Sequence, residues 1–131
     1  DQIAFNYRMP NINAALGCAQ LEALPGFLES KRRLFERYSK EFSVVDGVHL
    51  MKEPDNCVSN YWLQTLILDE QEEDLRDQVL KETNDSGLMT RPVWQLINRL
   101  KPYRDCPCGP LPVAESLEKR IVNIPSSAGI V

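Results

Sequence analysis

Residues 58–68 constrain the fold of this chain more than any other stretch. The segment Val58 to Leu68 is aromatic and aliphatic, with apolar side chains at both odd and even positions. Such a run is typical of a β-strand that is covered on both of its faces. The strand needs neighbouring strands and helices to cover it, and the remainder of the chain is expected to supply them.

Two helical segments precede this strand. The first is expected from Asn11 to about Leu24, where Asn11 is a suitable N-cap residue. Pro25-Gly26 should then interrupt or bend the helix, because proline lacks the N–H that the helical hydrogen bond requires. A second helical segment is expected from Phe27 to about Phe42, with an apolar stripe at helical spacing formed by Leu28, Phe35, Tyr38 and Phe42.

The second helical segment also carries a run of cations. The run consists of Lys31, Arg32, Arg33 and Arg37. The simplest interpretation is a solvent-exposed face of the helix, and a phosphate-binding surface is the alternative. Intrahelical ion pairs at i,i+4 spacing support the solvated interpretation.

The segments on either side of residues 58–68 contain turn and cap signals. The stretch Val44 to Met51 is expected to contain a turn at Asp46-Gly47 and a short strand. Asp69 should cap the next helix, with Glu72 at capping-box spacing. That helix should end near Ser86, where Gly87 can adopt the left-handed conformation that closes many helices.

The C-terminal third predicts two further strands. Residues 88–94 form a strand that lies at a sheet edge or ends at Pro92, because proline cannot donate to a ladder. A helical turn at 95–100, a helix at 113–120 and a strand at 121–124 follow it. The sequence therefore predicts an α+β fold, in which helices pack on one face of a small, mostly antiparallel sheet.

Composition limits the range of functions. The 131 residues suit a single domain, residues 1–131, and the net charge of −4 gives no electrostatic basis for binding nucleic acid or an anionic membrane. No apolar run approaches the roughly 20 residues of a membrane-spanning helix, so we expect neither nucleic acid nor membrane as a partner. The four cysteines are scattered, apart from the Cys106-Pro107-Cys108 pair, and His49 is the single histidine. We therefore expect no zinc site, and free thiols in a cytoplasmic protein.

Phosphate chemistry is suggested by the polar segment before the first helix. An amide, a phenol and a guanidinium, on Asn6, Tyr7 and Arg8, precede a helix N-terminus, which favours anions. A plain polar loop is the alternative interpretation of this segment.

Two groups of motifs resemble the DegT/DnrJ/EryC1/StrS-type nucleotide-sugar aminotransferases, which are pyridoxal-phosphate enzymes of the aspartate-aminotransferase fold type. The first group is Asn6-Tyr7-Arg8-Met9, Asn13-Ala14-Ala15-Leu16-Gly17 and Ala19-Gln20-Leu21-Glu22. The second is Thr90-Arg91-Pro92-Val93-Trp94, Pro102-Tyr103, Ala114-Glu115 and Asn123-Ile124-Pro125-Ser126-Ser127. The resemblance covers nearly the whole chain, but only the C-terminal small domain of such an enzyme.

The resemblance implies a division of roles between two parts of the enzyme. The lysine that binds pyridoxal phosphate would lie upstream, in a large N-terminal domain, so this chain alone should be inactive. Asn6 would reach across a homodimer to the cofactor phosphate, and Arg8 would meet the cofactor or the substrate diphosphate. Guanidinium groups suit such contacts, because they recognise phosphate through paired hydrogen bonds.

A second set of residues corresponds to the segment that lines the sugar-nucleotide pocket in the family. These are Arg91, Trp94 and Asn98. A strand-end salt bridge is the alternative for Arg91, and core packing is the alternative for Trp94. Many family members have histidine where this chain has Asn98, which leaves the polar contact to the keto-sugar open.

The implied reaction moves an amino group, from glutamate, to a 4-keto-6-deoxy sugar nucleotide for surface-polysaccharide biosynthesis. Within the family, the closest resemblance is to the legionaminic-acid branch. A 3-keto or perosamine-type aminotransferase is one alternative. A non-catalytic oligomerisation or regulatory domain on the same scaffold is the other.

Overall fold

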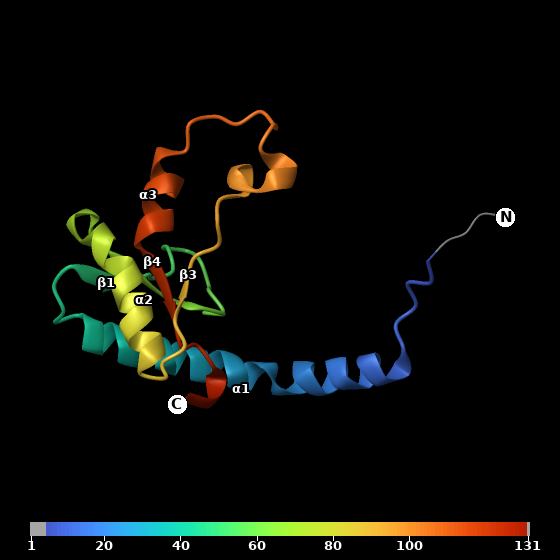
Figure 1. Cartoon of the computed structure of the whole chain (residues 1–131). Helices are drawn as coiled ribbons and strands as arrows, with labels where there is room; N and C mark the ends of the chain where they lie inside the picture. Colours follow the sequence, from blue (N-terminus) through green and yellow to red (C-terminus); the bar gives the residue numbers. More distant parts are fainter. Residues whose placement is uncertain (1–4, 131) are drawn as a thin grey trace.

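The structure is a computed structural model that describes residues 5–130. Its longest element is α1 (Asn11–Phe42), a helix of 32 residues. The sheet and the other helices gather around the C-terminal half of α1, whereas its N-terminal half extends beyond them and ends in the arm of residues 5–10 (Figure 1). The molecule is thus a compact body with a long projecting helix.

A four-stranded sheet forms the centre of the body. The strands β1 (Val48–Leu50), β2 (Gln64–Leu68), β3 (Arg91–Pro92) and β4 (Ile121–Ile124) lie in the order β1-β2-β4-β3. All three neighbouring pairs are antiparallel. The predicted α+β class is confirmed, and β3 lies at the sheet edge, as the proline in it required.

The alternating burial of side chains along β2 shows which face of the sheet carries the core. Gln64, Leu66 and Leu68 are buried, whereas Thr65 and Ile67 between them are only partly covered. Leu66 pairs with Val122 in β4, which is fully buried, and Leu34 of α1 is also buried. Because side chains alternate between the faces of a strand, one face of the sheet carries the core.

Two shorter helices complete the body. A 3-10 segment (Glu70–Leu75) leads into α2 (Arg76–Asp85), and α3 (Pro112–Arg120) runs directly into β4. Gly87 closes α2 with φ of +80°, as predicted. Short 3-10 segments at Ile97–Arg99, Lys101–Tyr103 and Ala128–Ile130 occupy the connections.

The long N-terminal helix is confirmed, and of the two expectations at Pro25-Gly26 the interruption was wrong. α1 is continuous, and Pro25 lies inside it. Proline costs a helix one hydrogen bond, but its fixed φ of about −65° is itself helical. The helix on both sides is long enough to continue through the lost bond.

The predicted side-chain caps also differ from the structure. Pro10, and not Asn11, occupies the N-cap position of α1, and its carbonyl accepts from the N–H of Ala14. Asp69 lies at the predicted cap position, but it makes no side-chain cap bond. Its carboxylate instead lies 3.3 Å from Nδ1 of His49, so a cross-strand contact has replaced the local one.

The central strand is shorter than predicted, because residues 58–63 form a loop. Tyr61 is buried with φ of +44°, in the left-handed region that interrupts a strand. Its ring packs under α1, while the neighbouring Trp62 points outward.

The cationic run on α1 divides into two pairs. Arg33 and Arg37 are exposed, as a solvated face requires, but Lys31 and Arg32 are partly buried and bind other segments. The prediction of a solvated face was therefore wrong for Lys31 and Arg32.

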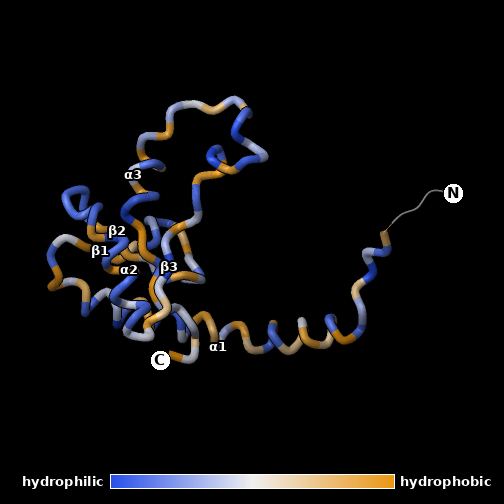
Figure 2. Tube along the Cα trace, in the orientation of Figure 1, coloured by the Kyte–Doolittle hydropathy of each residue, from blue (hydrophilic) through white to orange (hydrophobic). Residues whose placement is uncertain are grey.

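Apolar residues also recur along the projecting half of α1 (Figure 2). Ile12, Leu16 and Leu21 are all more than 60% exposed.

Within residues 5–130, no helix is both long and apolar enough to cross a membrane.

Candidate functional site

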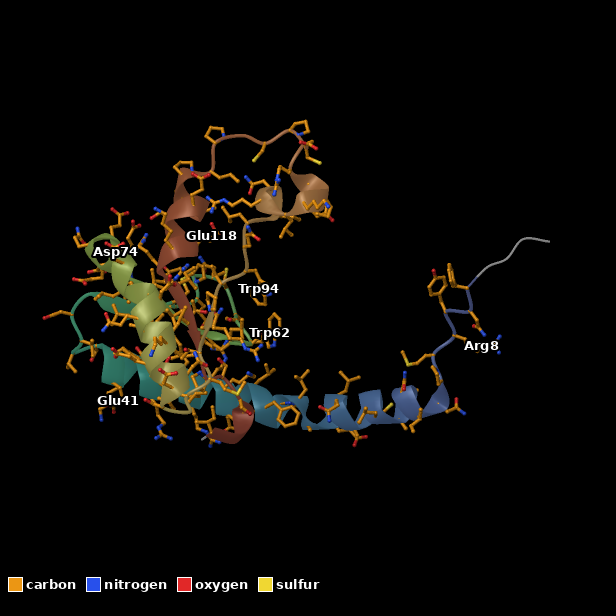
Figure 3. The ribbon with its side chains drawn as sticks, viewed as in Figure 1. Arg8, Glu41, Trp62, Asp74, Trp94 and Glu118 are labelled. Atoms are coloured by element: carbon orange, nitrogen blue, oxygen red, sulfur yellow. The ribbon has the colours of Figure 1, made fainter. Side chains whose placement is uncertain are left out.

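The N-terminal arm presents Asn6 and Arg8 far from the body. Arg8 lies at the far end of α1 from Trp62 and Trp94 (Figure 3). The side-chain oxygen of Asn6 accepts from the backbone N–H of Arg8 at 2.9 Å, which forms a local turn. Both residues are exposed, so their remaining donors face away from the rest of the described chain.

The donor set on this arm suits a phosphate group. The Asn6 amide nitrogen offers two N–H donors and the Arg8 guanidinium offers five, with no acidic side chain on residues 5–10. A helix N-terminus follows directly, and its free N–H groups favour an anion. The arm alone encloses no volume, so a phosphate bound there needs a second surface opposite it.

Two tryptophans face one another on the body. Trp62 follows the buried Tyr61, and Trp94 comes after β3. Their ring centroids are 6.2 Å apart with an angle of 26° between the planes. Sequence analysis selected Trp94 but missed Trp62, because the sequence predicted a continuous strand through residues 58–68 and gave no signal that Trp62 is exposed.

A groove of about 430 Å³ lies beside this tryptophan pair. Arg91 on the edge strand, Trp62, Asn123 of β4 and the residues Ser126 and Ser127 are among those that line it. A second hollow, of about 470 Å³, shares Lys31, Trp62 and Ser127 with the first. The structure therefore places Arg91 and the tryptophan pair together at one open surface.

Asn98 lies elsewhere. It lines a smaller hollow of about 200 Å³ with Tyr103, Cys106 and Cys108. Its side-chain oxygen is buried and has no hydrogen-bond partner among the described residues. Of the three predicted substrate residues, Arg91 and Trp94 are thus close to one groove, and Asn98 opens onto a separate hollow.

The loop that carries Trp62 is attached to α1 by an ion pair. Arg32 binds the carboxylate of Glu53 through two nitrogens, at 3.1 and 3.2 Å, and also donates to the carbonyl of Ser59 at 2.6 Å. The N–H of Ser59 donates to Glu53 in return. The Arg32 guanidinium and then the Ser59 N–H lower the pKa of Glu53, because both stabilise the carboxylate.

Lys31 attaches the same loop to the C-terminal segment. Its ammonium donates to the carbonyls of Trp62 at 3.1 Å and Ser126 at 2.6 Å, with that of Tyr61 at 3.5 Å. Partial burial lowers the pKa of Lys31, since desolvation disfavours the charged form. This lysine holds two walls of the groove in a fixed relation.

Comparison with known proteins identifies the family. The model of the DegT/DnrJ/EryC1/StrS aminotransferase family matches residues 1–130. The chain belongs to this aminotransferase family. Among curated proteins, it is 31% identical over 131 residues to the GDP-perosamine synthase of Vibrio cholerae, covering 99% of this chain and 35% of that protein.

Two further relatives of this family member show the same partial coverage. A pyridoxal phosphate-dependent aminotransferase of Bacillus subtilis, EpsN, is 37% identical over 94 residues, covering 72% of this chain and 24% of that protein. The solved structure of DesI with its TDP-sugar product is 27% identical, with a TM-score of 0.85, covering 94% of this chain and 32% of that one. The chain spans about a third of the length of these relatives or less.

Proposed function

We propose that this chain is the C-terminal domain of a pyridoxal-phosphate-dependent aminotransferase that acts on a sugar nucleotide. The whole enzyme would transfer an amino group from glutamate to a 4-keto-6-deoxy sugar nucleotide, for surface-polysaccharide biosynthesis in the cytoplasm. The family match along residues 1–130 carries this proposal. The large N-terminal domain, with the cofactor-binding lysine, would precede these residues.

Asn6 and Arg8 are the residues proposed to meet the cofactor. When bound, pyridoxal phosphate supplies the ring through which the amino group passes between donor and acceptor. Asn6 would donate to the cofactor phosphate in the active site of a second subunit, and Arg8 would neutralise charge beside it. The distance of the arm from its own body supports this arrangement, because nothing on the body lies opposite Arg8 (Figure 3).

Arg91, Trp94 and Asn98 are proposed to bind the sugar nucleotide. Arg91 lines an open groove and makes no ion pair with any residue from 5 to 130, so its guanidinium is available to a phosphate. The buried side-chain oxygen of Asn98 has no partner within residues 5–130 and can accept a hydrogen bond from a hydroxyl. The keto-sugar nucleotide would then have to contact both the groove that Arg91 lines and the hollow that Asn98 lines.

A perosamine-type reaction is the second candidate. The Vibrio cholerae relative, which matches along nearly the whole chain, bears the name GDP-perosamine synthase. This favours a guanosine nucleotide as the carrier, whereas the DesI structure contains a TDP-sugar.

Product analysis of the full-length protein tests the proposal. The protein, loaded with pyridoxal phosphate, would be incubated with glutamate and a panel of GDP-, UDP- and TDP-linked 4-keto-6-deoxy sugars. We expect 2-oxoglutarate and an amino sugar nucleotide in equal amounts from one nucleotide class. If the cofactor binds but no member of the panel is aminated, the non-catalytic alternative replaces this proposal.

A further inference from the structure

Two large aromatic rings stand open to solvent at one place on the body. Trp62 and Trp94 are 65% and 66% exposed, and each covers part of the other by stacking. Tryptophan offers a wide apolar face and is favoured where a ring of another molecule binds. The two residues come from different segments, so the fold and not local sequence brings them together.

The position of Trp62 is fixed by its buried neighbour. The ring of Tyr61 stacks on Phe35 of α1, with centroids 4.3 Å apart and planes at 18°. The guanidinium of Arg32 lies over the Tyr61 ring, 5.4 Å from its centroid. These contacts hold Tyr61 at a φ of +44°, a conformation that persists only when the surroundings impose it.

The backbone of Trp62 is held on both sides. Its N–H donates to the side-chain oxygen of Asn60 at 2.9 Å, and its carbonyl accepts from Lys31 at 3.1 Å. Because the peptide groups around it are fixed, little backbone freedom remains for Trp62 to lose when a ligand arrives. Such preorganisation lowers the cost of binding.

The pair offers exposed ring surface on which a planar ring can stack. Aromatic carbons in contact lie about 3.5–4.0 Å apart, so a ring between two others needs about 7 Å. The centroids of Trp62 and Trp94 are 6.2 Å apart. That distance is within the range for offset-stacked rings in contact, so a planar ligand would stack on an exposed outer ring face, or Trp94, which lies in an irregular segment, would have to move for a ring to insert.

The charge of the adjacent groove complements a phosphate. Arg91 and Lys31 line it, and no aspartate or glutamate is among the described residues at its surface. The chain as a whole has a net charge of −4, so the lack of acidic side chains is a feature of this groove and not of the whole chain. A planar heteroaromatic ring that carries phosphates matches both features.

We propose that Trp62 and Trp94 stack the nucleobase of the sugar nucleotide, while Arg91 binds its diphosphate. The inference rests on the proposed function and assigns a part of the substrate to a residue pair that includes Trp62. Pyridoxal phosphate also has a ring and a phosphate, so the test is done on protein already loaded with pyridoxal phosphate, and any ring that the tryptophans then bind belongs to the added nucleotide.

The test uses nucleotides without the sugar, on the full-length protein loaded with pyridoxal phosphate. GDP, UDP and TDP are titrated by calorimetry against the parent protein and the Trp62→Leu, Trp94→Leu and Trp62→Phe variants, with inorganic pyrophosphate as the ring-free probe. We expect Leu at either position to raise the Kd of the nucleotide bound by the parent about 5- to 150-fold, the range for loss of base stacking. Trp62→Phe should recover much of the affinity, and pyrophosphate affinity should not change.

Arg91→Gln is the complementary variant. It should weaken pyrophosphate and nucleotide to a similar extent, because it removes a phosphate contact and no ring. Val44→Ala, at an exposed position outside the groove, is the matched control and should bind every probe as the parent does.

Two results would overturn the inference. One is an unchanged nucleotide Kd in both Leu variants, whether or not their melting temperature falls, and the other is an equal loss of pyrophosphate and nucleotide affinity. If nucleotides bind through the rings but no keto-sugar is aminated, the proposed reaction fails and the base site stands.

Discussion

Tyr61 shows at the scale of one residue how this fold departs from local preference. An aromatic residue favours an extended strand conformation, yet Tyr61 adopts a left-handed one. Stacking on Phe35 and the cation of Arg32 compensate for that conformation. The result is that Tyr61 is buried and Trp62 is exposed.

Asn6 provides the first prediction at this scale. Asn6→Ala in the full-length enzyme should weaken retention of pyridoxal phosphate, because a hydrogen bond to a charged group contributes about 1.5–3 kcal/mol. Cofactor absorbance after dialysis measures this, and the melting temperature of the cofactor-free protein should not change. Equal retention by variant and parent would show that Asn6 only shapes the loop.

Arg91 and Trp94 provide the second prediction, which concerns substrate binding. Arg91→Ala and Trp94→Ala should lower kcat/KM for the keto-sugar half-reaction by a factor equivalent to about 1–3 kcal/mol. The glutamate half-reaction should be nearly unaffected, because glutamate is short and does not span to this domain. Single-turnover kinetics measures each half separately, and equal slowing of both would contradict a substrate-binding role.

Substitution of Asn98 tests substrate preference in the same single-turnover kinetics. Asn98→His restores the residue that many family members have, and we expect it to change the preferred keto-sugar more than it changes stability. A loss of stability with the preference unchanged would assign Asn98 to packing.

Glu53 gives a prediction on pH. Its pKa in the folded protein lies below the ordinary value of about 4.3, so the folded state binds the proton more weakly than the unfolded state. The contribution of Glu53 to stability is therefore complete above pH 4.3 and is lost as pH falls through the lowered pKa. Urea unfolding should show Glu53→Gln less stable than the parent at pH 7, with the difference narrowing below pH 4.

At the scale of elements, the two halves of α1 have different structural roles. Its C-terminal half carries Leu34 in the core and the loop-binding Lys31 and Arg32. Its N-terminal half projects from the body and holds the arm with Asn6 and Arg8 away from it (Figure 1). Pro25 lies near the junction of the two halves.

Substitution of Pro25 tests whether the continuous helix is under strain. Proline within a helix costs about 3 kcal/mol relative to alanine, so Pro25→Ala should slow hydrogen exchange of the amides in residues 12–24. Gly26→Ala is the matched control: no atom lies within 4 Å of the added Cβ, and we expect a smaller effect of about 1 kcal/mol. Faster exchange in Pro25→Ala would contradict this account and indicate that the proline fixes the direction of the helix.

At the scale of the whole molecule, the arm and the tryptophan groove are too far apart to act on one bound molecule within the same chain (Figure 3). A homodimer in which the arm enters the site of the other subunit would resolve this separation. The exposed apolar residues of projecting α1, such as Ile12 and Leu16, would then have a surface to cover them.

Subunit complementation tests this arrangement. One subunit would carry Asn6→Ala and the other a substitution of the upstream cofactor-binding lysine. If Asn6 acts across the dimer, the mixed dimer contains one site with both residues intact and should recover up to half of the parental cofactor content. Mixed dimers that retain no more cofactor than Asn6→Ala alone would show that Asn6 serves its own subunit.

Local sequence determined the order and type of most elements. The strand at β4, the helix at α3, the edge position imposed by Pro92 and the left-handed Gly87 all follow from short-range chemistry. The resemblance of the motifs to an aminotransferase family was likewise readable from the sequence and was confirmed. The site residues, in contrast, stay predictions.

Tertiary contacts decided the features that local preference could not. Lys31 and Arg32 have the spacing of a solvated face, and only the approach of the 53–62 loop converts them into anchors. The loop itself begins where a strand was expected, because Phe35 lies in place to receive Tyr61. The pairing of Trp62 with Trp94 depends on these long-range contacts, because no local rule links two side chains so far apart in the chain.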